Sequence, residues 1–359
     1  MLSLIDTSFL IIYNKFMFKI YVIWAKITLQ GVILNSLKSV LAKAKNKDKI
    51  IVFPEAGFSD RIIKAAQFLN KKKIAKVVLL GDESALVLRY KNLQGMTIIN
   101  PRTSDIGDDL IKVLYQKRKA KGMTMQEAEN LVADPIYFGA LLVETGFADC
   151  MVAGAETSSS KVIKTALQVV GVENKGSIAS SFMLIQGKNK YMPKGGEMLL
   201  ADVGFNINPN AEELAIIASQ TAESARNLFD IKPRVAVLSY STNGSANGES
   251  AEKSRAAAEI LKAENHNFVV DGEMQLDSAL VPEVCGLKYP NSQIQGDANV
   301  LVFPDLQSGN IAYKAIERFG SLKAVGPIIQ GLKKPINDLS RGASVEDIIF
   351  TSAITILMA

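Results

Sequence analysis

Hydrophobic and polar positions alternate along the chain between short apolar runs and longer segments with helical spacing, from about residue 35 to the C-terminus. The apolar runs are rich in β-branched residues and end at Gly, Pro or Asp, which is typical of strands covered on both faces. These predicted strands span residues 49–53, 76–81, 234–240, 266–272 and 299–305. Because helical segments such as 59–70 separate them, the pattern predicts an α/β fold with largely parallel sheets.

One long helical segment carries clear signals at its N-terminal end. Residues 208–228 read NPNAEELAIIASQTAESARNL. Asn208 is predicted to cap this helix, with Pro209 at the first helical position. Glu212 and Glu213 then lie in the first turn, where the positive end of the helix dipole favours acidic side chains.

The first 34 residues contain an apolar stretch that does not fit a membrane span. Lys15, Lys19 and Lys26 divide it into uncharged runs of about eleven residues or fewer, whereas a bilayer span needs roughly 18. A signal peptide is disfavoured because Asp6 precedes the first Lys and no small-residue cleavage site follows. Residues 1–33 are therefore predicted to be an extension of unknown role, in a cytoplasmic protein without a membrane partner.

Positive charge is concentrated near the start of the chain. The 359 residues carry a formal net charge of +5, and residues 1–50 contribute +6 through eight Lys and two Asp. Residues 51–359 therefore carry −1, so the body offers no basic surface of the kind that nucleic-acid binding requires. A nucleic-acid partner is not predicted.

The cysteines and the single histidine give little support to metal or triad chemistry. Cys150 and Cys285 stand far apart without the spacing of metal ligands, and His266 lies in a strand-like run. Neither thiol has a His or a basic pair beside it in sequence to activate it as an acyl-carrying nucleophile. Reduced structural thiols and no metal site are expected.

Several ordered sequence blocks together resemble the phosphotransacetylase family, the phosphate acetyl/butyryl transferases. The three strongest blocks are NDLSRGASVED (337–347), NVLVFPDLQSGNIAYKAIERFG (299–320) and VLSYSTNGSANGES (237–250). Further matching blocks span 52–66, 134–160, 201–218 and 271–280. The resemblance covers residues 34–359, and so many blocks at compatible spacing make chance similarity implausible.

The resemblance implies a two-domain α/β fold similar to that of isocitrate and isopropylmalate dehydrogenases, with the active site in the interdomain cleft. The first domain would comprise residues 34–176 and 328–359, and the second residues 177–327. The implied activity is reversible acetyl transfer between acetyl-CoA and phosphate, by direct attack of the coenzyme A thiol in a ternary complex. Coenzyme A is then a substrate, no cofactor is tightly bound, and a homodimer is expected.

The C-terminal block contains the candidate catalytic residues. Ser340 and Arg341 lie in a Gly-containing loop that runs into a helix starting near Ser344, so backbone N–H groups and a guanidinium can converge on one anion. The resemblance places this Ser-Arg pair at the reacting centre and implies that Asp347 accepts the thiol proton. Ser344 and Asp347 also have the spacing of a helix cap, where an acid is favoured for structural reasons alone.

Candidate substrate-binding residues lie on three other segments. Asn310, Lys314 and Arg318 recur every four residues on a predicted helix after the strand end at 303–305, so they share one face. Arg118 matches a family arginine associated with coenzyme A, although a solvated basic helix end is the simpler interpretation. The Gly-, Ser- and Asn-rich segment 241–248 suits either a ligand contact or an ordinary turn. Its candidate residues are Ser241, Thr242 and Gly244.

The sequence departs from the family pattern at two positions. Lys164 stands where the family usually has an arginine, so the charge is kept and the bidentate fork is lost. Thr157 stands where a histidine is often found. Altered affinity for coenzyme A or phosphate is therefore expected, and Lys164 remains a candidate substrate-binding residue.

Three alternative functions share part of this evidence. A phosphate butyryltransferase-like enzyme would use most of the same anion-binding residues. A non-catalytic acetyl-CoA-binding regulator is possible, because related domains fused to malic enzymes act as sensors. A dehydrogenase would share the fold, but the chain shows no convincing nucleotide fingerprint or Asp-rich metal cluster.

Overall fold

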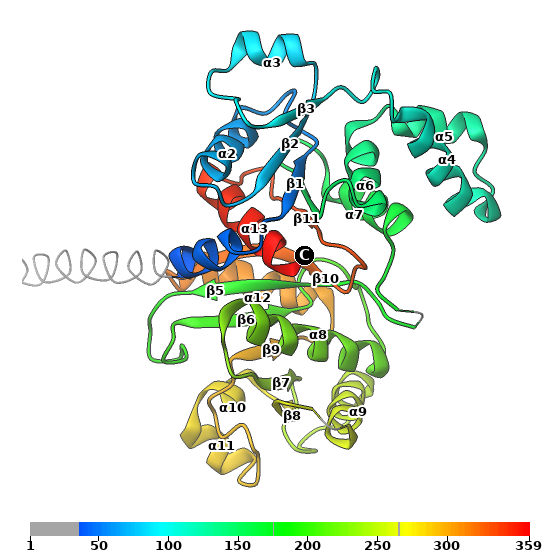
Figure 1. Ribbon diagram of the computed structural model, residues 1–359. Coiled ribbons are helices and arrows are strands. Elements are labelled where there is room, and N and C mark those ends of the chain that lie inside the picture. The colour runs from blue at the N-terminus through cyan, green and yellow to red at the C-terminus, as the bar shows by residue number, and fades with distance from the viewer. Residues whose placement is uncertain (1–35, 175, 265) are drawn as a thin grey trace, which may run out of the picture.

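The computed structural model describes residues 36–174, 176–264 and 266–359, which form two β-sheets with helices packed around each (Figure 1). The predicted extension at residues 1–33 lies outside the described residues. In the described part of the chain, no helix is long and apolar enough to cross a membrane.

The first sheet is entirely parallel. Its strand order is β11 (Ile336–Asp338), β4 (Cys150–Ala153), β1 (Ile50–Phe53), β2 (Lys76–Leu80) and β3 (Thr97–Ile99). The helices of this half are α2 (Asp60–Lys71), α3 (Glu83–Arg89), α4 (Gly107–Arg118), α5 (Met125–Val132), α6 (Pro135–Thr145), α7 (Ser159–Val169) and α13 (Val345–Met358), with a 3₁₀ turn at Lys119–Lys121. Every residue of β4 is buried, as expected for a parallel sheet covered on both faces.

The second sheet is mixed. Its strand order is β10 (Lys323–Gln330), β5 (Ser180–Gln186), β6 (Glu197–Ala201), β9 (Val300–Val302), β7 (Arg234–Leu238) and β8 (Val269–Met274). The helices of this half are α8 (Ala211–Phe229), α9 (Glu249–Ala263), α10 (Leu276–Leu280), α11 (Pro282–Lys288) and α12 (Leu306–Phe319). All five predicted strands are present, but the β10-β5-β6 edge is antiparallel, which the apolar runs did not predict.

The helix at 211–229 begins later than predicted. Its cap is Asn210, whose side chain accepts the N–H of Glu213 at 2.8 Å, and the Glu213 carboxylate accepts the N–H of Asn210 at 2.9 Å. Asn208 instead accepts a hydrogen bond from Lys253 at 2.6 Å. The prediction of an Asn208 cap was wrong because this reciprocal capping box requires an acid three residues after the cap, and that spacing selects Asn210.

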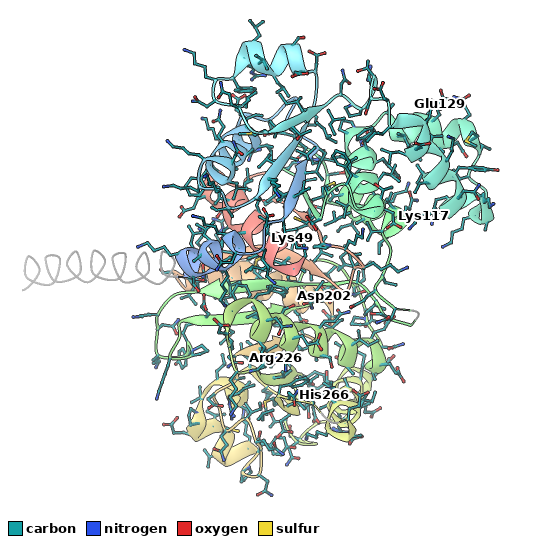
Figure 2. The ribbon with its side chains drawn as sticks, in the orientation of Figure 1. Lys49, Lys117, Glu129, Asp202, Arg226 and His266 are labelled. Atoms are coloured by element: carbon teal, nitrogen blue, oxygen red, sulfur yellow. The ribbon has the colours of Figure 1, made fainter. Side chains whose placement is uncertain are left out.

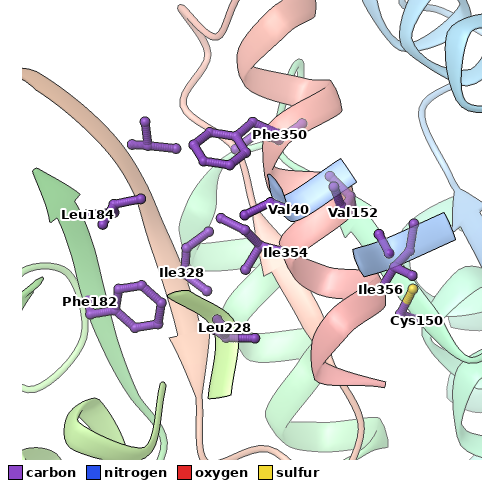
Figure 3. Close-up of a cluster of buried hydrophobic side chains, with 14 of the residues drawn as sticks. Val40, Cys150, Val152, Phe182, Leu184, Leu228, Ile328, Phe350, Ile354 and Ile356 are labelled. Carbon is purple, nitrogen blue, oxygen red and sulfur yellow. The ribbon is translucent and has the colours of Figure 1, made fainter. Parts of the chain in front are cut away.

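Helix α13 joins the two halves through one continuous hydrophobic core. Phe350 and Ile354 on α13 belong to the same buried cluster as Val152 of β4, Phe182 of β5 and Ile328 of β10 (Figure 3). Because one helix packs against strands of both sheets, the relative position of the sheets is set by close-packed side chains.

The chain returns from the second sheet to the first between β10 and β11. The predicted domain division at 327/328 falls within β10, which stays paired with β5 through Gln330. Asn337 on β11 then ties the two sheets, because its side chain accepts the N–H of Ile329 at 2.6 Å and donates to Thr355 at 3.0 Å. The division into two domains at the stated residues remains a prediction.

Candidate active site

Two adjoining pockets open where the β11–α13 connection meets α12 and β10. The first has a volume of about 590 Å³, and its lining includes Lys314, Arg318, Ser340 and Asp347. Four residues from two separate predicted segments therefore line one cavity. Lys314 and Arg318 are one turn apart on α12, as their spacing predicts.

The second pocket has a volume of about 440 Å³ and is lined by Ser340 and Arg341 of the same loop. Its polar lining residues are Ser158, Ser159, Ser181, Asn310, Asp338, Ser340 and Arg341. Ser340 lines both pockets, as do Tyr313 and Pro327. The loop at Ser340 and Arg341 thus lies between a cavity lined by Asp347 and one lined by Arg341 and the N-terminal residues of α7.

Arg61 on α2 holds the Ser340–Ala343 loop in place from a distance of 280 residues along the chain. Its guanidinium donates to the backbone oxygens of Arg341 and Ala343 at 2.8 and 2.7 Å. It also donates to the oxygen of Ala155 and the carboxylate of Glu156, at 2.7 and 2.9 Å. One side chain therefore fixes the loop relative to the segment that leads into α7.

The same α7 segment is held by a buried carboxylate. Glu55, which follows β1, accepts backbone N–H groups from all four residues of 154–157, at 2.7–3.0 Å. Thr157, the residue that departs from the family pattern, contributes one of these N–H groups. Since Glu55 is fully buried and its oxygens accept four bonds, its role is to shape this turn.

A second turn shaped by a carboxylate follows β6 of the mixed sheet and also lines the second pocket. Asp202, labelled in Figure 2, follows β6 and accepts hydrogen bonds from Ser181, from the N–H of Gly204 at 3.1 Å and from the N–H of Asn206 at 2.8 Å. Gly204 and Phe205 line the second pocket. Asp202 therefore shapes the turn through which the mixed sheet contributes to the second pocket.

Asp347 is both a helix cap and a charged group in the first pocket. Its Oδ2 accepts the N–H and the hydroxyl of Ser344 at 3.0 and 2.7 Å, and Lys323 lies 3.1 Å from Oδ1. Burial raises the pKa of Asp347, but the Ser344 hydrogen bonds and the Lys323 ammonium outweigh it, so the pKa is lower than usual. The capping prediction is confirmed, and the carboxylate stays ionised at neutral pH.

Arg118 and Lys164 lie together in a third pocket of about 440 Å³. Tyr137 and Gln168 also line it, and their side chains are hydrogen-bonded at 2.6 Å. Lys164 follows Ile163, which lines the second pocket, so α7 borders both cavities. The structure therefore brings the predicted binding residues Arg118 and Lys164 together, in a pocket across α7 from the second pocket.

Ser241, Thr242 and Gly244 do not line any of these three pockets. The Ser241 hydroxyl and the Gly244 N–H both donate to Glu273, at 2.8 and 2.9 Å, and Thr242 accepts the N–H of Gln275 at 2.9 Å. Their strand β7 is separated from β10 by three strands. Ser241 and Gly244 are thus hydrogen-bonded to buried Glu273 outside these pockets, and a substrate-binding role for the three residues stays a prediction.

The chain matches a family model described as phosphate acetyl/butaryl transferase over residues 35–356. It belongs to this family. A phosphate acetyltransferase of Thermoanaerobacterium thermosaccharolyticum is 43% identical over 328 residues, which cover 91% of this chain and 100% of the relative. A solved phosphotransacetylase from Streptococcus pyogenes, 39% identical, has a TM-score of 0.85 and covers 90% of this chain and 98% of its own.

A more distant solved structure shares the fold alone. The branched-chain phosphotransacylase from Enterococcus faecalis has a TM-score of 0.61 at 22% identity, covering 86% of this chain and 98% of its own. The resemblance and the α/β fold inferred from the sequence are confirmed by these comparisons.

Sequence reasoning missed four residues that build the site: Glu55, Arg61, Asp202 and Lys323. Glu55 and Arg61 occur in the block 52–66, and Asp202 in the block 201–218. For these three, membership of a family block was the available signal, whereas Lys323 lies outside every block, and no local pattern indicates which distant residue each one contacts.

The thiols and the histidine lie away from the cleft. Cys150 and Cys285 are buried and line none of the three pockets, and burial raises the pKa of the Cys150 thiol well above its usual range. His266 stacks on Phe268 next to the outer strand β8 (Figure 2). Neither thiol is placed to attack a substrate bound in the cleft.

Proposed function

We propose that the protein is a phosphate acetyltransferase, transferring an acetyl group reversibly between coenzyme A and inorganic phosphate in a ternary complex. The observation that carries this proposal is the pair of adjoining pockets on either side of Ser340, one containing Arg341 and the other Asp347. Acetyl transfer needs an anion site beside a site where a thiol loses its proton, and this arrangement supplies both.

We assign phosphate or the phosphoryl group of acetyl phosphate to the Arg341 pocket. A planar guanidinium, the hydroxyls of Ser159 and Ser340, and the N-terminal end of α7 suit a tetrahedral anion. Helix α7 has 11 residues, and the Ser158 side chain accepts no backbone N–H of the helix, which leaves the first N–H groups available.

We assign the thiol end of coenzyme A to the first pocket. Asp347 is ionised there and Lys314 and Arg318 supply positive charge for phosphate groups. Arg118 and Lys164 in the third pocket extend this set for a ligand with several phosphates. No covalent acyl-enzyme is invoked, because neither cysteine reaches the cleft. The homodimer stays a prediction.

Proton transfer from the thiol must be concerted with its attack on the acetyl carbonyl. Moving a proton from an ordinary thiol to an ordinary Asp costs roughly 6 kcal/mol. The lowered pKa of Asp347 increases that cost. Attack of sulfur on the carbonyl as the proton leaves avoids a free thiolate, and Arg341 stabilises the negative charge that develops on the phosphate side.

The test is coenzyme A-dependent consumption of acetyl phosphate by the wild-type protein and two variants. Asp347→Asn keeps a polar cap and should lose at least about 100-fold in kcat. Ser344→Ala, the matched control, removes the cap hydroxyl and should cost about 1 kcal/mol of stability while losing less than tenfold in kcat.

Two results would contradict the proposed activity, and a third would contradict the role of Asp347. Coenzyme A binding without turnover in the wild type would favour the regulatory protein. Higher initial rates with butyryl phosphate than with acetyl phosphate would favour the longer-chain acyltransferase. Equal turnover in Asp347→Asn and wild type would reduce Asp347 to a helix cap.

A further inference from the structure

The proposed reaction needs a second proton-transfer group on the phosphate side of the cleft. When the thiol displaces phosphate from acetyl phosphate, the C–O bond electrons go to a phosphate oxygen. Without a proton that leaving group is the fully ionised trianion, which is strongly basic and departs poorly. The thiol proton taken by Asp347 is in the other pocket, so another acid must serve the departing oxygen at the moment of bond cleavage.

Asp338 is a buried acid in the pocket that we assign to phosphate. It is the last residue of β11, two residues before Ser340, and it is only 3% exposed. It lines this pocket with Ser159, Ser340 and Arg341. It is held at the end of a paired strand, opposite Ala153 of β4, and not on a surface loop.

The surroundings of Asp338 leave one oxygen of its carboxyl group without a hydrogen-bond partner among the described residues. A Cβ at Gly154 would lie 2.2 Å from Asp338 Oδ1, so the missing side chain at Gly154 makes room for this carboxyl. Oδ1 is buried without a hydrogen-bond partner within the described ranges. A buried carboxyl group with one unpaired oxygen is costly unless it is protonated or has a function.

These surroundings set the protonation of Asp338. Burial raises its pKa to about 7, the Ser159 side chain opposes the shift, and the negative charge of Glu55 after β1 adds to it. Of the neighbouring elements, α7 contributes the uncharged Ser159 and the following loop contributes Arg341. A group that is half protonated near neutral pH can both give and take a proton.

We propose that Asp338 is the general acid that protonates phosphate as it leaves acetyl phosphate, and the base that deprotonates phosphate in the reverse direction. In the forward direction the sulfur–carbon bond forms, the carbon–oxygen bond breaks, and the Asp338 proton passes to the departing oxygen to give monohydrogen phosphate. The thiol proton remains on Asp347, and exchange with solvent restores both carboxyl groups. This inference rests on the proposed function.

The other two charged candidates, Arg341 and Asp347, fit this role less well. Arg341 does not release its proton in the accessible pH range. Asp347 lines the other pocket and is ionised, which suits the opposite task. Two carboxyl groups whose surroundings drive their pKa values apart are the arrangement expected of an acid and a base acting on one reaction.

The experiment measures kcat/KM for acetyl phosphate at saturating coenzyme A across about pH 6–8.5, because this parameter reports ionisation before acetyl phosphate binds. Wild type should lose roughly tenfold per pH unit above the Asp338 pKa. Asp338→Asn should be at least about 100-fold slower at pH 6 and should lack this alkaline decline. Asn337→Ala, at the preceding buried position of β11, should keep the wild-type profile shape even if it is less stable.

The possible outcomes distinguish a failure of this inference from a failure of the proposed function. A constant fold-loss for Asp338→Asn at every pH, or wild-type rates in that variant, would overturn the inference. If the variant does not fold, the wild-type profile decides, because a level kcat/KM from pH 6 to 8.5 also overturns it. Absence of coenzyme A-dependent turnover in wild type would instead refute the proposed function.

Discussion

Replacing Asp338 by Asn should stabilise the protein, and more so at alkaline than at acidic pH. The folded protein holds the Asp338 proton up to a pKa of about 7, whereas the unfolded chain releases it near 3.8. Between these values the folded state binds more protons than the unfolded state, so wild-type stability falls as pH rises. The penalty is absent below about pH 4 and complete above about pH 7.

The size of the effect follows from the shift in pKa. A difference of about three pH units, at about 1.4 kcal/mol each, gives a total of about 4 kcal/mol. Roughly 2–3 kcal/mol of this develops between pH 5 and pH 8. Asparagine does not ionise, so the variant escapes the penalty, and the contributions of all other groups cancel in the comparison.

Thermal unfolding of both proteins at pH 5 and pH 8 measures the difference. For a chain of this size about 1 kcal/mol corresponds to roughly 2 °C in Tm. The Tm advantage of Asp338→Asn should therefore be about 5 °C larger at pH 8 than at pH 5. Asn337→Ala serves as the non-ionising control, with the same Tm change at both pH values. An advantage for Asp338→Asn that does not grow with pH would refute the assignment of a buried acid that the folded protein keeps protonated.

Three further substitutions test the geometry of the cleft. Arg341→Ala should lower kcat at least about 100-fold with a smaller effect on coenzyme A binding, and calorimetry of coenzyme A binding would expose a pure affinity loss. Arg61→Lys should lower kcat about tenfold with coenzyme A binding retained, because one ammonium cannot reach the four acceptors of the guanidinium; wild-type kcat would show that the loop holds its own shape. Lys164→Arg should tighten anion binding by about 0.5–1.5 kcal/mol, seen as a lower KM with little change in kcat, and equal Michaelis constants for both substrates would place Lys164 outside the site.

The sequence alone determined the elements whose signals are local. The five apolar runs became strands because a β-branched run between turn residues carries its own preference. Ser344 and Asp347 predicted the start of α13 because a capping box is contained within four consecutive residues. The family blocks also named Ser340, Asp347 and Arg318 as site residues, and these three line one cavity, while their roles stay predictions.

Only the tertiary structure decided which distant groups meet. Arg61 contacts a loop 280 residues away, and Ser241 turns its hydroxyl to Glu273 in place of the cleft. Asp338 looks in sequence like any acid at the end of a strand, and its character comes from burial against Gly154 and from the charge of Glu55. Burial and long-range contacts depend on how whole elements pack, and a local pattern contains no information about the partner on the other side of the core.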